Sequence, residues 1–259
     1  MKNLTQPLFD LTGKTAIVTG AGQGIGRGIA EGLATAGASI VIADINSDTM
    51  SQTSSHIRET CKVEVMEFSL DVRREEQVLN LMDETIAAFG SLDILVNNAG
   101  IVTISEPQSM SMEDWDKTMD INLRSVFVLC QNAYHHLKKS ANGKIINIAS
   151  IYAIFGAQYL PSYAASKSGL VQLTRSLAIA WAPDNIQANC ILPGWINTPL
   201  SIEGRKNNPA AHDIVVGRTP AGRWGDPQDL AGTAIFLASG ASQYVTGVSI
   251  PVDGGYSIN

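Results

Sequence analysis

The sequence predicts an α/β fold, a doubly wound parallel sheet of about seven strands with helices on both faces. Two observations lead to this prediction. Short apolar runs alternate with longer amphipathic stretches along the whole chain, which is the pattern of βαβ units. The apolar runs are continuous, as expected for strands that are buried on both faces. No linker rich in Pro, Gly or Ser interrupts the alternation, so residues 1–259 are expected to form a single domain.

Each expected strand is a short aliphatic run that stops at a polar or glycine-containing turn. In chain order the runs are 15–18, 39–43, 63–68, 94–96, 145–148, 187–192 and 247–250.

The expected helices each have one apolar face. The helix that begins near Arg74 is typical, because Gly90 supplies its stop. Its apolar positions are Val78, Met82, Ile86 and Phe89. The first helix shows the same spacing and ends at Gly37. Two longer helices are expected near 111–139 and 162–181.

The longest stretch without strand character runs from Pro193 to about Asp226 and holds four of the ten prolines. A segment of this length inside a compact domain is typical of a lid or a binding loop. We therefore expect a substrate loop at about 193–226, with a plain surface insertion as the alternative.

Composition limits the class of protein. A chain with 45% hydrophobic and 16% charged residues is globular rather than disordered. Its net charge is −6 and it has no long run of Lys or Arg, which argues against a nucleic-acid partner. No signal peptide and no apolar run of about 18 residues is present, so no membrane partner is expected.

Cysteine and histidine positions give no sign of a disulfide or a metal site. Cys61, Cys130 and Cys190 lie far apart and form no Cys-x-x-Cys pair. They fit reduced thiols in a cytoplasmic protein better than a disulfide framework or a zinc site. The four histidines show no metal-ligand spacing beyond one adjacent pair, so no metal is expected.

A glycine-rich segment, Thr19-Gly-Ala-Gly-Gln-Gly-Ile-Gly26, follows the first strand and opens the first helix. Glycine permits a tight turn and lets backbone N–H groups approach a pyrophosphate, while the helix N-terminus adds partial positive charge. The segment predicts a dinucleotide-binding Rossmann domain, with a simple tight turn as the alternative. The expected cofactor contacts in it are Gly20, Gln23, Gly24, Ile25 and Gly26.

Asp44 ends the second strand, where a carboxylate can accept hydrogen bonds from an adenosine ribose. A carboxylate at this position repels a 2′-phosphate, and Gln23 offers no positive charge to neutralise one. NAD is therefore expected in preference to NADP.

Two further strand ends supply candidate cofactor contacts. Asp71 and Val72 follow the third strand, and Asn98, Ala99 and Gly100 follow the fourth. Open α/β sheets bind ligands at the carboxyl ends of their strands, which favours a role in cofactor binding. Ordinary Asx turns are the alternative.

Tyr163 and Lys167 stand four residues apart in a segment with helical period, so both side chains share one face. An ammonium about 4 Å from a phenol stabilises the phenolate by up to roughly 4 kcal/mol, or about three pKa units. We expect this pairing to lower the pKa of Tyr163 and to make it a general acid or base.

Tyr134 and Lys138 have the same spacing, but His135, His136 and Leu137 between them leave little room for a cofactor. Ser150 lies 13 residues before Tyr163, whereas the equivalent position for Tyr134 is Ile121, which has no hydroxyl. Tyr134 and Lys138 are therefore expected to be a pair on a helix surface.

Together these motifs resemble the short-chain dehydrogenase/reductase family over nearly the whole chain. They occur in the family's order: Thr19-Gly-x3-Gly-x-Gly26, Asp71, Asn97-Asn-Ala-Gly100, Asn122, Ser150, Tyr163-x3-Lys167, Pro193-Gly194 and Thr198.

The resemblance implies a role for each catalytic residue. Tyr163 exchanges a proton with the substrate hydroxyl or carbonyl, and Ser150 orients and polarises that oxygen. Lys167 holds the nicotinamide ribose and lowers the tyrosine pKa, so both it and Tyr163 also contact the cofactor. Asn122 kinks its helix and holds a water that relays protons to Lys167. Four more residues line the nicotinamide and its phosphate: Pro193, Gly194, Ile196 and Thr198.

The resemblance places substrate contacts after Ser150 and after Pro193-Gly194. Gln158 and Trp195 are the expected contacts there, beside Ser150 and Tyr163. Aromatic surface beside hydrogen-bonding groups suits a sugar or polyol, and Arg205 or Lys206 could pair with an acidic substituent. The stretch 218–230 is similar to that of family members that oxidise gluconates.

Three functions are compatible with these motifs. The favoured one is an NAD-dependent dehydrogenase of a sugar, sugar acid or polyol, which converts a secondary alcohol to a ketone or a lactol to a lactone. A 3-oxoacyl-thioester reductase is the alternative, and Asp44 counts against it because biosynthetic reduction generally uses NADPH. A non-catalytic nucleotide-binding regulator is the third. The resemblance also implies a homotetramer, with a dimer left open.

Overall fold

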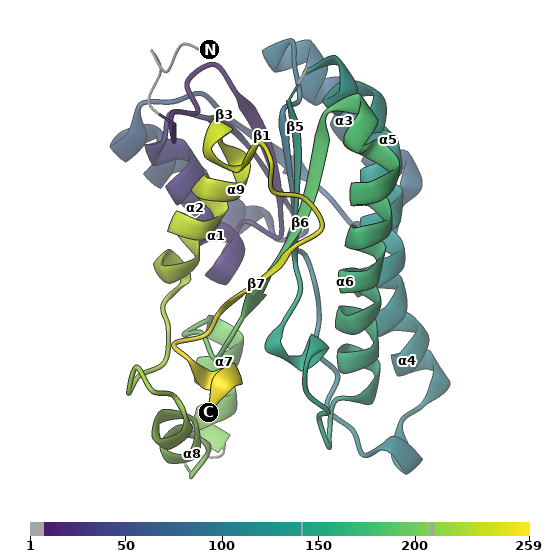
Figure 1. Cartoon of the computed structure of the whole chain (residues 1–259), viewed down its shortest axis with the longest axis vertical. Helices are drawn as coiled ribbons and strands as arrows, with labels where there is room; N and C mark the ends of the chain where they lie inside the picture. The colour runs from purple at the N-terminus through teal and green to yellow at the C-terminus, as the bar shows by residue number, and fades with distance from the viewer. Residues whose placement is uncertain (1–7, 141, 208–209) are drawn as a thin grey trace.

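The computed structural model describes residues 8–140, 142–207 and 210–259 (Figure 1). The N-terminal residues 1–7, in which no signal peptide is predicted, lie outside them. One parallel sheet of seven strands forms the centre, in the order β3-β2-β1-β4-β5-β6-β7. Its strands are β1 (Thr15–Thr19), β2 (Ser39–Asp44), β3 (Val65–Ser69), β4 (Ile94–Asn97), β5 (Gly143–Ile148), β6 (Ile186–Pro193) and β7 (Ser249–Val252).

The seven expected strands are confirmed, with ends that differ from the predicted ones by a few residues. Every residue of β1, β4, β5 and β6 is buried, which explains why these runs are apolar throughout. Strands β3 and β7 are the sheet edges and are only partly buried.

Nine α-helices occur in the described part of the chain, and most of them cover the sheet. They are α1 (Gly24–Thr35), α2 (Ser47–Cys61), α3 (Glu75–Phe89), α4 (Met112–Met119), α5 (Ser125–Lys139), α6 (Pro161–Trp181), α7 (Pro199–Asn207), α8 (Ala210–Arg218) and α9 (Ala231–Ala238). As Figure 1 shows, α1, α2 and α9 cover one face of the sheet, and α3, α5 and α6 cover the other.

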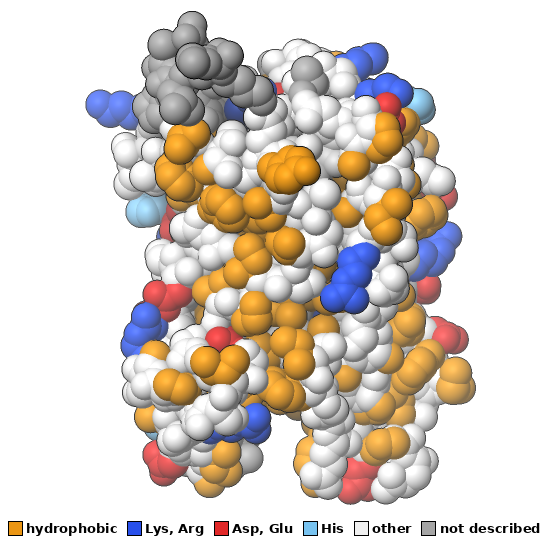
Figure 2. Space-filling view, in the orientation of Figure 1, with side chains coloured by type: hydrophobic (Ala, Val, Ile, Leu, Met, Phe, Trp, Pro, Cys, Tyr) orange, Lys and Arg blue, Asp and Glu red, His pale blue; other side chains and the backbone are white. Residues whose placement is uncertain are grey.

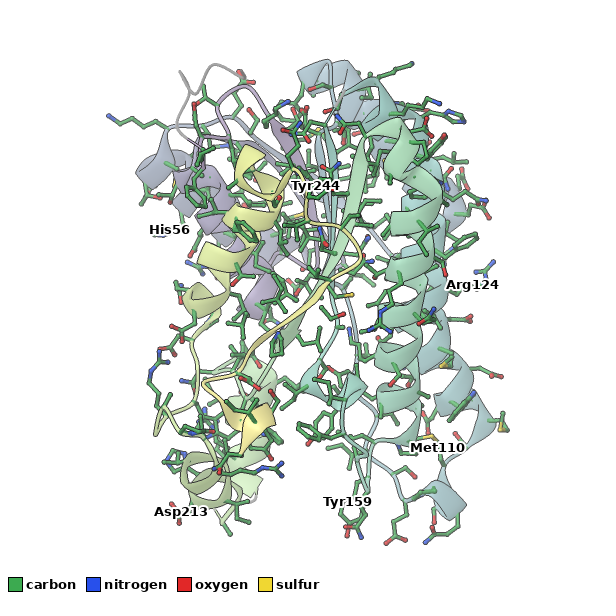
Figure 3. All side chains as sticks on the ribbon, viewed as in Figure 1. His56, Met110, Arg124, Tyr159, Asp213 and Tyr244 are labelled. Carbon is green, nitrogen blue, oxygen red and sulfur yellow. The ribbon has the colours of Figure 1, made fainter. Side chains whose placement is uncertain are left out.

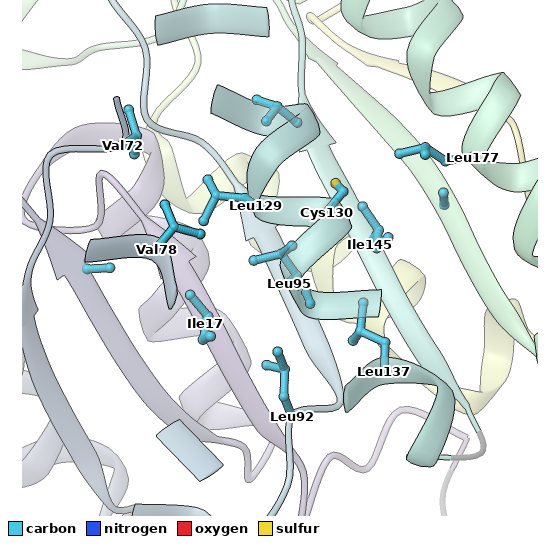
Figure 4. Close-up of a cluster of buried hydrophobic side chains, with 14 of the residues drawn as sticks. Ile17, Val72, Val78, Leu92, Leu95, Leu129, Cys130, Leu137, Ile145 and Leu177 are labelled. Atoms are coloured by element: carbon cyan, nitrogen blue, oxygen red, sulfur yellow. The ribbon is translucent and has the colours of Figure 1, made fainter. Parts of the chain in front are cut away.

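A separate hydrophobic core fills the space on each side of the sheet. Ile29, Leu33 and Ile57 belong to the core under α1 and α2. Figure 4 shows the opposite core, in which Leu129 and Leu137 of α5 pack against strand residues that point to that side. Apolar burial on both faces holds the strands in register and fixes the edge at which they end.

Glycine stops two helices where the sequence predicts. Gly90 follows α3 with φ +77°, and its N–H donates to the carbonyl of Ile86. Gly37 follows α1 with φ +101°.

The segment 193–226 is not an irregular loop, and this is a correction to the sequence-based expectation. It contains α7 and α8. The helices were not predicted because their outer faces are polar or exposed and their apolar residues show little periodicity. They form a lobe beside the lower end of the sheet in Figure 1, and Asp213 of α8 lies at the lower end of this lobe (Figure 3).

The strand order places the chain's change of direction between β1 and β4. After β1 the chain builds β2 and β3 outward on one side, and it then returns to build β4 on the other. The loops that leave β1 and β4 therefore diverge, which opens a crevice at the carboxyl ends of the strands. Figure 2 shows the molecule hollowed at its lower end, between the lobe of α7 and α8 and the opposite lobe.

No helix in the described residues is long and apolar enough to cross a membrane.

Candidate active site

The sequence-predicted site residues lie around the carboxyl edge of the sheet. Most of them lie at the ends of β1 to β6, in the loops that follow these strands or in the first turn of α1. Asn122 lies at the junction of α4 and α5, and Tyr163 and Lys167 lie in the first half of α6.

The glycine-rich turn after β1 is packed too tightly for side chains at two positions. Gly20 has φ +63°, which favours glycine, and a Cβ there would stand 2.9 Å from the Cα of Ala99. A Cβ on Gly26 would lie 2.2 Å from the carbonyl oxygen of Gly20 and 2.4 Å from the amide nitrogen of Asn98. These contacts explain the glycines at these positions.

Asn98 joins this turn to the end of β4. Its side-chain amide donates to the carbonyls of Thr19 at 2.9 Å and Gly20 at 3.0 Å. The Thr19 hydroxyl in turn accepts from the backbone N–H groups of Asn98 at 3.0 Å and Ala99 at 3.1 Å. The predicted cofactor residues of two strand ends are therefore one hydrogen-bonded unit.

Asp44 accepts hydrogen bonds from the glycine-rich turn and from the start of the next loop. One carboxylate oxygen accepts from the N–H of Gly22 at 2.8 Å, and the other accepts from the N–H of Asn46 at 3.0 Å. A carboxylate has about four acceptor positions, so further acceptor capacity remains for ribose hydroxyls.

The first turn of α1 is suited to an anionic phosphate. Among the described residues Gln23, at the N-cap, makes no capping hydrogen bond, and the first turn holds no acidic side chain. Thr198, which begins the α7 segment, lies against the same turn, since a Cβ on Gly24 would be 3.3 Å from its methyl carbon. The uncapped N–H groups and the close glycine turn fit a dinucleotide pyrophosphate.

Asp71 is held by an arginine that the sequence analysis did not single out. Arg73 donates from Nε to one carboxylate oxygen at 2.9 Å and from Nη2 to the other at 2.7 Å. This bidentate pairing is the main reason why the pKa of Asp71 is lowered. Val72, between them, is buried.

The segment after β6 is fixed by the end of the chain and by a distant loop. The N–H of Gly194 donates to the carbonyl of Val252 at 3.0 Å, so Pro193 and Gly194 are anchored beside β7. Ile196 forms an isolated parallel bridge with Gly225.

Asn122 interrupts the long helix that the sequence predicts. A π-helical turn, Asp120–Arg124, separates α4 from α5, and Asn122 is fully buried within it. Its amide also donates to the hydroxyl of Ser166 on α6 at 3.2 Å. A π turn at a polar residue agrees with the expected kink.

Ser150, Tyr163 and Lys167 come together at the carboxyl edge of the sheet. Ser150 lies two residues beyond the end of β5 and forms a hydrogen bond with Tyr163. The ammonium nitrogen of Lys167 lies 5.7 Å from the centroid of the Tyr163 ring and donates to the carbonyl of Ile148 at 2.7 Å. Gly100 faces the same place, since a Cβ there would be 3.2 Å from Oδ1 of Asn122 and 3.6 Å from Nζ of Lys167.

The pKa shifts at this site differ from the expectation. Burial raises the pKa of Tyr163, and the hydrogen bond with Ser150 offsets only part of that rise. Burial also lowers the pKa of Lys167 to about 8. The expected lowering of the Tyr163 pKa by Lys167 is therefore wrong for this structure. Desolvation of the buried phenol is the largest cause of the rise, and Lys167 is not among the groups that shift this pKa.

The second Tyr-x-x-x-Lys pair lies outside the site. Tyr134 and Lys138 both reach Asp184 beyond the end of α6, the tyrosine by a short hydrogen bond and the lysine by an ion pair of 2.8 Å. Tyr134 also packs on Trp181. The pair ties α5 to the end of α6, as a structural pair does.

An aromatic cluster extends from Tyr163 across the crevice. The ring of Tyr152 lies 6.3 Å from that of Tyr163 and 6.0 Å from that of Trp195. Trp195 continues the contact to Trp224 at 5.3 Å and to Tyr256 at 6.4 Å. Trp195 is therefore linked to Tyr163 through the ring of Tyr152.

Several residues of this cluster could not be found from the sequence. Tyr152 lies in the segment that was singled out for substrate contacts, but Trp224 and Tyr256 belong to separate segments far along the chain. Trp224 is brought to Trp195 by the bridge between Ile196 and Gly225. The turn before Tyr256 is anchored by the hydrogen bond from the N–H of Ala221 to the carbonyl of Gly254. Nothing in the residues around Tyr256 indicates that it belongs to this cluster.

The other residues expected near the substrate have different surroundings from one another. Gln158 is exposed. Arg205 donates to Oδ1 of Asn197 at 2.7 Å and lies 4.0 Å from the centroid of Trp224. Lys206 is exposed and pairs with Glu203 at 2.8 Å.

Comparison with known proteins agrees with this geometry. A family model described as enoyl-(acyl carrier protein) reductase matches residues 20–257. The 2-dehydro-3-deoxy-D-gluconate 5-dehydrogenase of Escherichia coli K12 is 43% identical over 251 residues, which cover 96% of this chain and 97% of the relative. The 3-oxoacyl-[acyl-carrier-protein] reductase of Thermotoga maritima is 35% identical, with coverages of 96% and 99%.

Among solved structures, a gluconate 5-dehydrogenase from Burkholderia cenocepacia, in complex with NADP and tartrate, superposes with a TM-score of 0.92. It is 39% identical, and the match covers 97% of this chain and 98% of that one. The matches span nearly the entire chain, including the glycine-rich turn, Ser150, Tyr163 and Lys167. The chain belongs to the short-chain dehydrogenase/reductase family, whose members are nicotinamide-dependent oxidoreductases.

Proposed function

We propose that this protein is a dehydrogenase that interconverts a secondary alcohol and a ketone on a sugar acid, with Tyr163 as the general acid and base. The observation that carries the proposal is the meeting of Asn122, Ser150, Tyr163 and Lys167 in one crevice beside the glycine-rich turn. The gluconate-type relatives support the substrate class, because they are similar over almost the full length of both chains.

The residues present fit a nicotinamide dinucleotide. Gly20, Gly24, Gly26 and the first turn of α1 would hold the pyrophosphate, and Asp44 would accept from the adenosine ribose. Asp71, Val72, Asn98, Ala99 and Gly100 would line the adenosine and ribose side of the crevice. When bound, the nicotinamide supplies the hydride chemistry.

The chain itself handles the proton. Tyr163 takes the proton of the substrate hydroxyl during oxidation and returns it during reduction. Ser150 forms a hydrogen bond with Tyr163 when no substrate is bound, and its single hydroxyl proton would turn to the substrate oxygen in the complex. Lys167 and Asn122, which both face Gly100, then provide the path by which the proton leaves or enters. The aromatic rings of Tyr152 and Trp195 exclude water from one side of this centre.

We also propose that NAD is the preferred cofactor. Asp44 lies beside the turn, and Asp48 adds a second negative charge in the first turn of α2. The nearest cation on α1, Arg27, is paired with Glu31 at 2.7 Å. A 2′-phosphate would therefore meet carboxylates without a free cation among the described side chains near Asp44. The Burkholderia structure contains NADP, so the preference needs a direct measurement.

The decisive experiment is a nicotinamide absorbance assay with matched tyrosine variants. Wild-type protein is offered NAD and NADP with D-gluconate, 2-dehydro-3-deoxy-D-gluconate, polyols and secondary alcohols, and NADH and NADPH with an acetoacetyl thioester. Tyr163→Phe is expected to lose turnover by about a thousandfold or more while it still binds NADH. Tyr134→Phe, which has the same spacing to a lysine, is expected to retain turnover.

Three other results would contradict parts of the proposal. Turnover of the thioester alone with NADPH would establish the 3-oxoacyl reductase that the Thermotoga relative suggests. Binding of NADH without turnover of any substrate would favour a nucleotide-binding regulator. Full activity of Tyr163→Phe would exclude the assigned mechanism.

We further propose a cytoplasmic homotetramer, as the family resemblance implies. The outer face of α5 and α6 supports self-association, since Phe127 is 44% exposed and Leu123 and Leu173 line a surface depression beside it. Light scattering on the purified protein would test this assembly, and a monomer would exclude it.

A further inference from the structure

Arg218 stands over two rings at the edge of the aromatic cluster and has no acidic partner among the described residues. Arg218 ends α8, and its guanidinium carbon lies 4.4 Å from the centroid of the Tyr256 ring and 5.3 Å from that of Phe155. The two rings meet edge to face at 6.3 Å. Arg218 is thus held over a platform made by two segments that are far apart in the sequence.

The backbone around Arg218 is fixed by the end of the chain. Its carbonyl accepts from the side-chain amide of Asn259 at 2.9 Å. Three residues later, the N–H of Ala221 donates to the carbonyl of Gly254 at 3.0 Å. The backbone that carries the guanidinium is therefore held in place, although Arg218 as a whole is exposed.

Neighbouring arginines use their N–H groups within the chain, and Arg218 does not. Arg205 donates to Asn197, and Arg223 donates to the carboxylate of Asp229 at 2.6 and 3.0 Å. Within the described residues Arg218 forms no ion pair and no side-chain hydrogen bond. Its planar set of five N–H donors is free to bind a planar carboxylate by two parallel bonds.

Arg218 also lies near the reacting centre. The pKa of Tyr152 is raised to about 12, mainly by burial, and the positive charge of Arg218 opposes this rise. Tyr152 is the ring that contacts Tyr163. Phe155 follows Ser150 by five residues, so the guanidinium stands where the segment after β5 meets the lobe of α7 and α8. Figure 2 shows the molecule hollowed between these two lobes.

We propose that Arg218 binds the carboxylate of the substrate and so sets the specificity of the enzyme for sugar acids over neutral polyols. This inference rests on the proposed dehydrogenase function. The carboxylate lies over the Tyr256 and Phe155 platform, and the carbinol carbon at the other end of the molecule lies beside Ser150 and Tyr163. Arg218 is a binding residue remote from the bond that changes, so its loss raises KM more than it lowers kcat.

The test compares two substrates that differ only at the charged end. D-Gluconate and D-glucitol share their other five carbons, and glucitol carries a hydroxymethyl group in place of the carboxylate. For Arg218→Gln we expect kcat/KM for gluconate to fall roughly ten- to thirtyfold, because a charged hydrogen bond is lost at an exposed site. The same variant should oxidise glucitol within about twofold of wild type.

Two further variants serve as controls. Arg218→Lys keeps the charge and the contact with the rings but loses the paired N–H donors, so it should recover only part of the activity on gluconate. Arg58→Gln removes the same charge from an exposed arginine that pairs with Glu67 at the far edge of the sheet. It should leave kcat/KM unchanged for both gluconate and glucitol. Thermal unfolding and NADH binding of each variant show whether the fold is intact.

The outcomes separate this inference from the function on which it rests. Equal losses on gluconate and glucitol for Arg218→Gln would overturn the carboxylate role and leave the dehydrogenase in place. A wild-type enzyme that oxidises polyols but not sugar acids would overturn the carboxylate role and the sugar-acid substrate class, and would leave only the dehydrogenase activity in place. A wild-type enzyme that oxidises neither would overturn both the inference and the proposed function.

Discussion

Asn122 and Ile101 exchange two hydrogen bonds across the junction of α4 and α5. The backbone N–H of Ile101 donates to Oδ1 of Asn122 at 2.9 Å, and the Asn122 amide donates to the carbonyl of Ile101 at 2.9 Å. The side chain thus pairs with the loop after β4 as a neighbouring strand would. This pairing holds Gly100 beside Lys167 and stabilises the π turn.

Asn122→Ala is expected to damage both stability and activity. It leaves the N–H and carbonyl groups of Ile101 without partners, at a cost of about 2 kcal/mol. It also frees the loop that carries Gly100, so kcat should fall at least about tenfold. Denaturant unfolding and steady-state kinetics measure the two effects. Asn132→Ala, which removes one amide from the same stretch of helix, should leave kcat unchanged. Equal effects of the two variants would refute the positioning role.

The pH dependence of the reaction should follow Tyr163. Its pKa is raised by burial, so the hydroxyl is protonated at neutral pH and is ready to act as an acid. Oxidation needs the phenolate, and kcat/KM for oxidation should therefore rise as the pH increases from about 6 to 10. Reduction should show the opposite trend. Ser150→Ala removes the hydrogen bond that lowers this pKa, so its profile should move to higher pH. An oxidation rate that declines over this range would contradict the assignment.

Asp44→Asn tests the cofactor preference. The substitution removes the negative charge but keeps an oxygen that can accept from the N–H of Gly22. We expect the ratio of kcat/KM for NAD to that for NADP to fall about tenfold or more, because repulsion of the 2′-phosphate is relieved. Parallel titrations with both cofactors give this ratio. A variant with an unchanged ratio would show that Asp44 does not select between them.

Lys144 lies in β5 and is 1% exposed, with the hydroxyl of Ser242 at 3.2 Å as its side-chain hydrogen-bond partner among the described residues. Burial lowers its pKa from 10.5 to about 8. Lys144 therefore binds its proton more tightly in the unfolded chain than in the folded one, which lowers the free energy of unfolding. This destabilisation is complete below about pH 8 and disappears as the pH rises to 10.5.

Lys144→Met should accordingly raise the free energy of unfolding by about 2 kcal/mol at neutral pH, and the gain should shrink near pH 10. Ser242 keeps its bond to the carbonyl of Leu237 in the variant. Denaturant unfolding at both pH values checks this, with the exposed Lys117→Met as the control. A gain that is independent of pH would show that the buried amine is not the cause.

Much of the fold could be predicted from local pattern. Runs such as 39–43 are apolar because β2 is buried on both faces, and the glycine at position 90 ends α3 because only glycine readily takes a positive φ. The placement of Ser150 and Asn98 at strand ends follows from the same pattern, because parallel strands end at one edge.

Other parts of the site required the packed structure. The Tyr163–Lys167 spacing predicts a shared helix face, but the sign of the Tyr163 pKa shift depends on burial by segments far along the chain. The helices α7 and α8 show little apolar periodicity, so their pattern resembles that of a loop.

The sequence by itself determined the seven strands in chain order, the glycine-rich turn and the candidate site residues. These are set by side-chain type and by neighbours a few residues away. Only the tertiary structure decided that Arg205 stacks on Trp224, while Arg218 is left over Phe155 and Tyr256 without an acid. The reason is that contacts between distant segments depend on how the helices and strands pack. Neither the charge of an arginine nor its spacing along the chain indicates which group it will contact.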